Sequence, residues 1–368
     1  MHGIRQCSSC EGAGDGRGMS DAVKHEPVTE LYAGFDLCTR LTTARLRRMY
    51  SIYAAGISPE DPLSVLEIGD VEPKPTPQEW VDVEVKAMSL NHHDVWALRG
   101  QALRAEQVPM ILGTDAAGIA PDGTRVVVHA VIGTPVRGDE TLDPKRSLLS
   151  EVYPGTFAER VRVPASNLIP LPESMGFEEA SCLPTAYLTA YRMLSTKSGT
   201  QPGDTVLIQG AGGGVSTAAI VLGKAMGLRV WVTSRDSAKG EWATTIGADD
   251  AFDVGARLPD KVDAVIETVG EATWDHSLKS LRPGGTIVVS GATSGAMPPS
   301  QLNRVFFLQL RVVGSTMGTS EEFSRLLALL AESGVRPIID RTLPMDSARE
   351  GFSAMIEGSM RGKIVMTR

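Results

Sequence analysis

The sequence of 368 residues has few cysteines and no long apolar segment. No apolar run reaches the length that a bilayer-spanning helix needs. The start also lacks the basic stretch and apolar core that mark a secretory signal. From these absences we expect a cytoplasmic protein that has no membrane partner and forms no disulfides. The four cysteines are Cys7, Cys10, Cys38 and Cys182.

Positive charge is also in short supply. Lys and Arg number 36 against 44 Asp and Glu, which gives a formal net charge of -8 and argues against a general nucleic-acid surface. The composition, 42% hydrophobic and 22% charged, is ordinary for a globular protein, and the length predicts two domains. We therefore expect a small-molecule substrate as the partner, and no nucleic acid.

The first 48 residues differ from the rest of the chain. No clear apolar period appears before Leu31, so we predict a disordered extension over residues 1–48. Cys7 and Cys10 have the spacing of half a zinc site, but no second pair of Cys or His follows to complete it. We interpret the pair as incidental and predict no metal site. Met49 would be a plausible start of translation.

Residues 204–234 have the pattern of half a dinucleotide-binding fold. An apolar run from Val206 to Ile208 predicts a buried strand, and a glycine-rich turn, a helix and a second buried strand follow. Glycines let the backbone lie against a pyrophosphate, and the helix N-terminus directs amide groups at it. The predicted cofactor-binding residues of this turn are Ala211, Gly212, Gly213, Gly214 and Val215.

The end of the second strand predicts which dinucleotide binds. An NAD site usually has Asp or Glu there for the ribose 2′-hydroxyl, whereas this chain has Thr233, Ser234 and Arg235. Ser234 can hydrogen-bond a 2′-phosphate, and Arg235 and Lys239 can neutralise it, so we predict NADP(H) as the cofactor. Two alternatives stay open: the two cations are merely solvated, or Asp236 supplies the acid after a shift of one or two residues.

Two patterns divide the body of the chain. From residue 49 to 170, short alternating segments such as VDVEV (81–85) are separated by Pro and Gly, which predicts an antiparallel, barrel-like domain. From 171 to 335, strands and helices alternate, which predicts a parallel sheet. Residues 362–367 form a last predicted strand.

Five short segments carry a more specific signal. They are SLNHHD (89–94), ILGTDAAG (111–118), GTFAE (155–159), FEEASCLPTAYLTAY (177–191) and RPGG (282–285). In this order they resemble the medium-chain dehydrogenase/reductase superfamily, and the resemblance covers residues 49–368. It implies an α/β fold with a GroES-like β-barrel catalytic domain at 49–170, completed by 336–368, and a Rossmann NADP(H)-binding domain at 171–335.

The departures from the family pattern concern zinc. In zinc alcohol dehydrogenases of this superfamily a Cys, a His and a second Cys hold the catalytic metal, and the matching residues here are Asn91, Thr114 and Thr185. Amide and hydroxyl oxygens are poor zinc ligands. Residues 130–154, where the family's structural zinc cysteines occur, contain no cysteine. The chain thus resembles the zinc-free quinone oxidoreductase branch, which includes enone and enoyl-thioester reductases.

The same resemblance supplies candidate catalytic residues. Reduction of a conjugated carbonyl needs a hydrogen-bond donor at the carbonyl oxygen and a proton for the α-carbon. Asn91 could donate to the substrate oxygen, and His93 matches the hydroxyl residue of the family's proton relay. Asp115 could orient His93, and Thr114 and Thr185 could line the same pocket.

Other residues have two interpretations. By resemblance, His92 approaches the cofactor pyrophosphate, and Val269 and Gly291 line the cofactor path. Asp115 could instead be a buried structural acid. Tyr187 is a low-priority acid candidate and a better candidate for a core or pocket aromatic.

The sequence therefore predicts a zinc-independent, NADPH-dependent oxidoreductase that transfers hydride to a quinone, an enone or another conjugated carbonyl. The alternatives are a zinc-free alcohol dehydrogenase and a non-catalytic NADPH-binding sensor or structural protein. An apolar strand near residues 308–314 makes a homodimer plausible, because the family commonly pairs its Rossmann sheets edge to edge.

Overall fold

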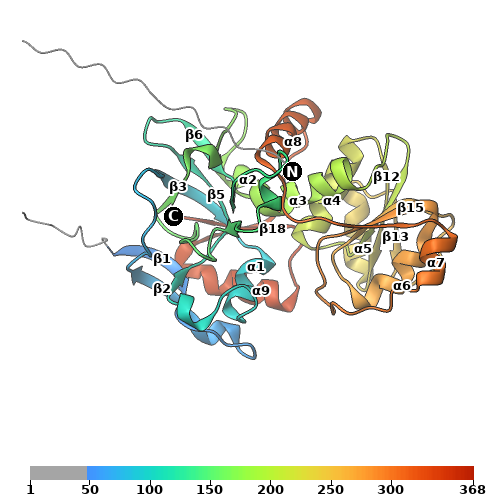
Figure 1. Ribbon diagram of the computed structural model, residues 1–368, viewed down its shortest axis with the longest axis horizontal. Helices are drawn as coiled ribbons and strands as arrows, with labels where there is room; N and C mark the ends of the chain where they lie inside the picture. Colours follow the sequence, from blue (N-terminus) through green and yellow to red (C-terminus); the bar gives the residue numbers. More distant parts are fainter. Residues whose placement is uncertain (1–47) are drawn as a thin grey trace, which may run out of the picture. The chain divides into compact units, whose positions relative to one another are not determined.

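The computed structural model describes residues 48–368 (Figure 1). The predicted extension, apart from its last residue, lies outside the described residues, and so do Cys7, Cys10 and Cys38. Among the helices of the described part, none is long and apolar enough to cross a membrane.

The first lobe is built of short strands, as the spacing of Pro and Gly predicts. A three-stranded sheet has the order β2–β1–β4, and a seven-stranded sheet has the order β10–β6–β5–β3–β18–β17 with β9 paired to β3. A further pair joins β7 to β8. The strands are β1 (Met49–Ala54), β2 (Leu66–Val71), β3 (Val81–Ser89), β4 (Met110–Ile111), β5 (Asp115–Ile119), β6 (Arg125–Val128), β7 (Val131–Ile132), β8 (Ser147–Leu148), β9 (Arg160–Val163), β10 (Leu168–Pro170), β17 (Ile339–Pro344) and β18 (Lys363–Thr367).

The second lobe contains the predicted parallel sheet. Six strands lie in the order β13–β12–β11–β14–β15–β16, which is the strand order of a doubly wound dinucleotide-binding fold. Helices α4 to α7 gather around this sheet in Figure 1. The elements are β11 (Thr205–Gln209), α4 (Gly214–Ala225), β12 (Arg229–Ser234), α5 (Ser237–Thr245), β13 (Asp250–Asp253), β14 (Val262–Glu267), α6 (Glu271–Ser280), β15 (Leu281–Val289), α7 (Leu302–Phe307) and β16 (Arg311–Gly314).

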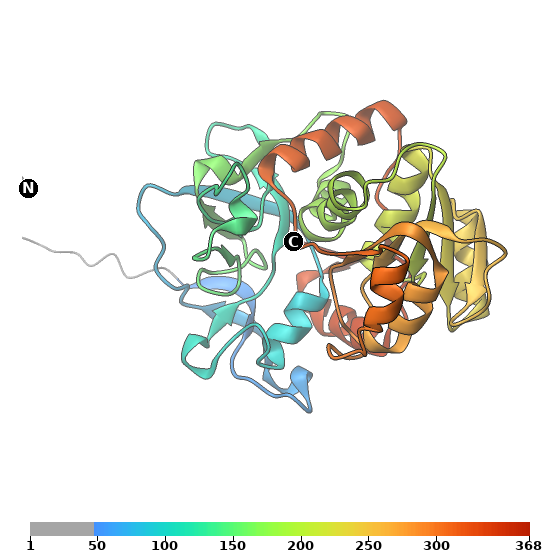
Figure 2. The same ribbon diagram turned by 45° about the vertical axis from the view of Figure 1, so that its right-hand side comes forward.

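Further helices cover the edges of the sheets. Figure 2 shows α8 beside α3, and residues of the two helices are in contact. The further helices are α1 (His92–Leu98), α2 (Phe177–Ser181), α3 (Leu188–Arg192), α8 (Ser320–Ser333) and α9 (Ala348–Glu357). The short helical turns are η1 (Pro62–Val65), η2 (Ala105–Gln107), η3 (Glu140–Leu142), η4 (Ala165–Asn167), η5 (Leu183–Tyr187), η6 (Met193–Lys197) and η7 (Met345–Ser347).

The last strand contributes to both hydrophobic cores. Ile364 and Met366 of β18 pack in the core of the first lobe, whereas Val365 packs in the core around β11 and α4. Successive side chains of a strand point to opposite faces, which explains this division. Because β17 and β18 join the sheet of the first lobe, residues 339–367 return to it after the second lobe is complete. The limits predicted for the two domains stay predictions.

The parallel sheet and the antiparallel lobe together confirm the predicted α/β fold. The register also brings three strands of the first lobe together at one point. Ser89 of β3 pairs with Asp115 of β5 on one side and with Val365 of β18 on the other. The ends of these strands position the candidate site.

Substitution of Gly113, which lies next to the candidate site, tests this local geometry. Its φ is +98°, and an added Cβ would lie 2.3 Å from the ring of Phe157. Gly113→Ala should therefore lower the free energy of unfolding through two effects, about 1–3 kcal/mol for the backbone strain and about 1–3 kcal/mol for the overpacking. Urea unfolding followed by circular dichroism measures the loss.

The matched control is Gly123→Ala. Gly123 also has a positive φ, +86°, but an added Cβ would meet no atom within 4 Å. This variant should lose only the strain contribution. Equal losses in the two variants would contradict the close packing of Gly113 against Phe157.

Candidate active site

The N-terminus of α1 is fixed by a buried acid. Asp94 accepts hydrogen bonds from the backbone N–H of Asn91 (2.8 Å) and of Gly113 (3.1 Å). Burial raises the pKa of Asp94 to about 6. Asp94 therefore braces the turn that presents Asn91 and ties it to the segment that carries Thr114.

The three residues at the positions of the family's zinc ligands meet in the structure. Asn91 Nδ2 lies 3.2 Å from Thr114 Oγ1, and Thr114 Oγ1 lies 2.9 Å from Thr185 Oγ1. They come from the start of α1, the loop before β5 and the turn η5. Thr114 and Thr185 thus lie beside Asn91, as the motif comparison predicts.

Lys363, which no sequence motif indicates, anchors this group. Its ammonium donates to the Leu90 carbonyl (2.6 Å), to Asn91 Oδ1 (2.6 Å) and to Asp115 Oδ2 (3.3 Å). The side chains of Lys363 and Asp115 are only 1% and 0% exposed, so this is a buried ion pair. All three ammonium protons have an acceptor, which offsets the cost of removing the charge from water.

The contacts fix which atom donates in the first two steps. Lys363 can only donate, so Asn91 accepts through Oδ1 and donates through Nδ2 to Thr114. Either hydroxyl can be the donor between Thr114 and Thr185. Thr185 is half-buried and has no other side-chain partner among residues 48–368, so its proton is free to donate outward when Thr114 donates to it. The chain of hydrogen bonds runs from the buried charge to the Thr185 hydroxyl, and each bond polarises the next.

His93 has a different partner from the one expected. Its Nε2 lies 3.1 Å from Glu151 Oε1, whereas Asp115 Oδ2 is taken by Ser89 (2.9 Å) and by Lys363. The expectation that Asp115 orients His93 is therefore wrong, because the carboxylate of the completely buried Asp115 binds Ser89 and Lys363 and does not bind His93. Burial raises the pKa of Glu151, but hydrogen bonds from His93 and the Leu148 amide outweigh it and lower the pKa.

Three other candidates are placed by their surroundings. His92 is exposed at its outer edge, but partial burial and the charges of Lys363 and Arg99 lower its pKa, which favours the neutral ring. Tyr187 is fully buried, and its hydroxyl accepts from the Ile338 amide (2.8 Å), so it is a core residue. Burial raises the pKa of the Cys182 thiol to about 12, which makes it unreactive.

The glycine turn lies next to this group. The N-cap of α4 is Gly213, so the first amides of the helix face the turn, as predicted. An added Cβ on Gly214 would lie 3.0 Å from Lys363 Cδ, and one on Gly212 would lie 3.1 Å from Lys239 Cδ. Two lysine side chains therefore pack closely against the glycine turn. These features fit the pyrophosphate of a dinucleotide.

The residues after β12 are arranged around an N-cap. Asp236 caps α5 by accepting from the amides of Ala238 (2.9 Å) and Lys239 (3.4 Å). Ser234 Oγ donates to the Asp236 carbonyl (2.7 Å), and Arg235 is exposed. Lys239 does not extend toward Arg235, because its ammonium donates to the Gly358 carbonyl.

The remaining predicted cofactor residues follow β14 and β15. The Val269 amide donates to Glu267 Oε1 (2.8 Å), a completely buried carboxylate that holds this turn. An added Cβ on Gly291 would lie 2.9 Å from the Thr268 carbonyl oxygen. The two turns are therefore packed against each other, and Gly291 borders a cavity of about 820 Å³ that also includes Trp96 of α1.

Comparison with known proteins agrees with this architecture. The family model described as "Alcohol dehydrogenase GroES-like domain" matches residues 77–173, and that described as "Zinc-binding dehydrogenase" matches residues 214–332. An acryloyl-coenzyme A reductase of Sulfurisphaera tokodaii is 30% identical over 319 residues, which covers 80% of this chain and 94% of the relative.

Two further comparisons extend over most of the chain. A quinone oxidoreductase of Mus musculus is 27% identical over 348 residues, covering 88% of this chain and 99% of the relative. The crystal structure of an NAD-dependent alcohol dehydrogenase superposes with a TM-score of 0.79 at 31% identity, covering 87% of this chain and 100% of that one.

The two lobes and the glycine turn define a two-domain oxidoreductase that uses a nicotinamide dinucleotide. The chain belongs to the medium-chain dehydrogenase/reductase superfamily, as its motifs predict.

The catalytic zinc of this superfamily does not fit the residues present. Asn91, Thr114 and Thr185 offer amide and hydroxyl oxygens in place of thiolate and imidazole, and the Lys363 ammonium already contacts Asn91. Within residues 48–368, no group of three or more His, Cys, Asp or Glu side chains could hold a metal ion.

Proposed function

We propose that this protein reduces the conjugated double bond of a quinone, an enone or a related carbonyl compound with NADPH, without a catalytic zinc. The hydrogen-bond chain from Lys363 through Asn91 and Thr114 to Thr185 is the observation that carries this proposal. It ends in a hydroxyl donor at the place where the family's metal would polarise a substrate oxygen. We also propose a cytoplasmic location, as the sequence predicts.

The chain's own residues supply what such a reduction needs. When bound, the reduced nicotinamide supplies the hydride. Negative charge develops on the carbonyl oxygen, and the Thr185 hydroxyl donates to it, with the buried ammonium strengthening each bond of the chain. His93, paired with Glu151, is the proposed source of the proton for the α-carbon. Asp115 acts as a positioning residue, because it contacts only Ser89 and Lys363.

Substitution of Thr185 tests the proposed donor. Thr185→Val keeps the shape but removes the hydroxyl, so kcat for an enone or quinone should fall about 100-fold, the usual effect of losing one such donor. Thr185→Ser should keep most of the activity. The measurement is NADPH oxidation followed by absorbance on a panel of quinones, enones and aldehydes, with and without a chelator.

The outcomes of this assay separate the alternatives. Turnover of a quinone or enone that a chelator leaves unchanged supports the proposal. Turnover that requires zinc, or that occurs only with simple aldehydes, would contradict it and indicate an alcohol dehydrogenase. NADPH binding without turnover on any acceptor would indicate the non-catalytic sensor.

NADP(H) is proposed as the cofactor because of the end of β12. The exposed Arg235 directly follows the strand, where its charge can meet a 2′-phosphate, whereas Asp236 is drawn to the N-cap of α5 through its Oδ1. The NAD-dependent alcohol dehydrogenase among the similar structures shows that the other preference occurs in the family.

Arg235→Ala tests this preference. Loss of one charge-assisted hydrogen bond to the 2′-phosphate, about 1.5–3 kcal/mol, should raise the Kd for NADPH at least tenfold and leave that for NADH nearly unchanged. Fluorescence titration measures both constants, and Lys261→Ala, a charge change elsewhere on the lobe, is the control. Equal weakening of both cofactors, or tighter binding of NADH than NADPH by the unaltered protein, would contradict the proposal.

A homodimer is proposed through the open edge of the parallel sheet. Next to the edge strand β16, α7 exposes Leu302 (66%), Phe306 (60%) and Phe307 (76%). Exposed apolar side chains beside an unpaired strand are typical of a subunit interface.

Charge introduced on α7 tests this interface. Phe307→Glu should convert the dimer to a monomer, as measured by light scattering after size exclusion. Ile356→Glu, on the partly exposed face of α9, should leave the mass unchanged. A monomeric mass for the unaltered protein would contradict the proposed dimer.

A further inference from the structure

The cavity beside Gly291 is strongly basic. Three cations, Arg146, Arg192 and Lys197, are among the residues that line its volume of about 820 Å³, and no Asp or Glu lines it. Charge of one sign around a hollow attracts ligands of the opposite sign. The three cations do not contribute equally, because their partners differ.

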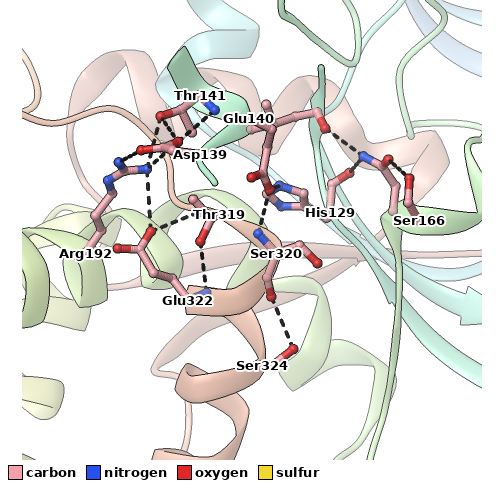
Figure 3. Close-up of polar contacts among 12 residues, drawn as sticks. His129, Asp139, Glu140, Thr141, Ser166, Arg192, Thr319, Ser320, Glu322 and Ser324 are labelled. Atoms are coloured by element: carbon pink, nitrogen blue, oxygen red, sulfur yellow. Dashed lines mark hydrogen bonds and ion pairs between the residues drawn. The ribbon is translucent and has the colours of Figure 1, made fainter. Parts of the chain in front are cut away.

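Arg192 is already neutralised. Figure 3 shows its guanidinium held between Asp139 and Glu322, and it also donates to Thr141 Oγ1 (3.1 Å). Its side chain is 3% exposed. It therefore serves to fix η3 against α3 and α8, and it adds little positive charge to the cavity.

Arg146 and Lys197 supply the uncompensated charge. Neither takes part in an ion pair within residues 48–368. Arg146 has an acid nearby, Asp143, but donates only to its backbone carbonyl (3.4 Å), while the Asp143 carboxylate accepts from the amides of Thr134 and Lys145. Two cations from different segments, one exposed and one half-exposed, thus share this cavity without an ion-pair partner among residues 48–368.

The same cavity reaches the cofactor path. Ser290 and Gly291, at the end of β15, line it together with Trp96 of α1 and with Ser315 after β16. Its volume exceeds what a small enone would occupy and lies at the upper end of ordinary ligand sites. A molecule that fills it would have one end beside Gly291 and Trp96, which belongs to the helix that also carries His93, and another end available for Arg146 and Lys197.

We infer that the substrate is an enoyl thioester whose carrier bears phosphate groups, as in coenzyme A, and that Arg146 and Lys197 bind those phosphates. This inference rests on the proposed reduction and names its substrate class. Hydride from NADPH adds to the β-carbon and a proton adds to the α-carbon, so the products are the saturated thioester and NADP⁺. The Sulfurisphaera relative, an acryloyl-coenzyme A reductase, has a name of this class.

Paired substrates isolate the role of the phosphates. Crotonyl-coenzyme A and S-crotonyl-N-acetylcysteamine have the same reacting thioester, but only the first has phosphates. The unaltered protein should have a kcat/KM at least 100-fold higher for crotonyl-coenzyme A, mostly through KM. This ratio should fall steeply between 50 and 300 mM salt, because salt screens exposed charges.

Charge removal in the cavity is the decisive variant. The double variant Arg146→Gln and Lys197→Gln should reduce the ratio of the two kcat/KM values at least tenfold, through the KM for crotonyl-coenzyme A. Lys145→Gln changes the same charge one residue away but does not line the cavity, so it should leave the ratio within twofold. Thermal unfolding of each variant checks that the fold is intact.

The outcomes distinguish the inference from the function on which it rests. Equal kcat/KM for the two thioesters, a ratio that the double variant leaves unchanged, or activity on quinones and simple enones with none on either thioester would overturn the inference and leave the proposed reduction standing. Absence of NADPH oxidation with every acceptor would overturn both.

Discussion

One buried ammonium group holds the candidate site together. Lys363 lies on the last strand, yet its three donors end on the start of α1 and on β5, which are far from it in the sequence. A lone charge in this position would cost several kcal/mol, so its acceptors must stay in place. The orientation of the Asn91 amide follows from this requirement, and so does the donation from Asn91 Nδ2 to Thr114.

The residues at the zinc-ligand positions of the superfamily leave no unpaired gap at the site. The three residues at the ligand positions are smaller or more polar than Cys and His, and they contact one another and a cation in place of a metal. A positive charge is present at the site on the Lys363 ammonium, which lies behind the Asn91 side chain and not at the ligand positions themselves. In the proposed function a hydroxyl donor takes the place of the Lewis acid, which suits a carbonyl whose charge is spread by conjugation better than a simple alcohol that must lose a proton.

Local patterns in the sequence predict most of the fold and part of the site. The glycine turn, the strand after it and the grouping of Asn91 with Thr185 all depend on motifs within short segments, and the structure contains each of them. Lys363 and Glu151 were not predicted, because their partners lie 272 and 58 residues away and no local pattern reports such a contact. A lysine at the start of an otherwise apolar strand was the only available signal. Asp115 was assigned to the wrong partner because adjacency in motifs does not give side-chain direction.

The alternating side chains of β18 also limit how the two lobes can move. Val365 is fixed in one core, and Ile364 and Met366 are fixed in the other. Pulling the lobes straight apart would draw apolar side chains into water on one side of the strand. The strand therefore belongs to both lobes at once, so an apolar substitution on either of its faces would loosen the core of one lobe and, through the shared backbone, the setting of Lys363 at the start of the strand.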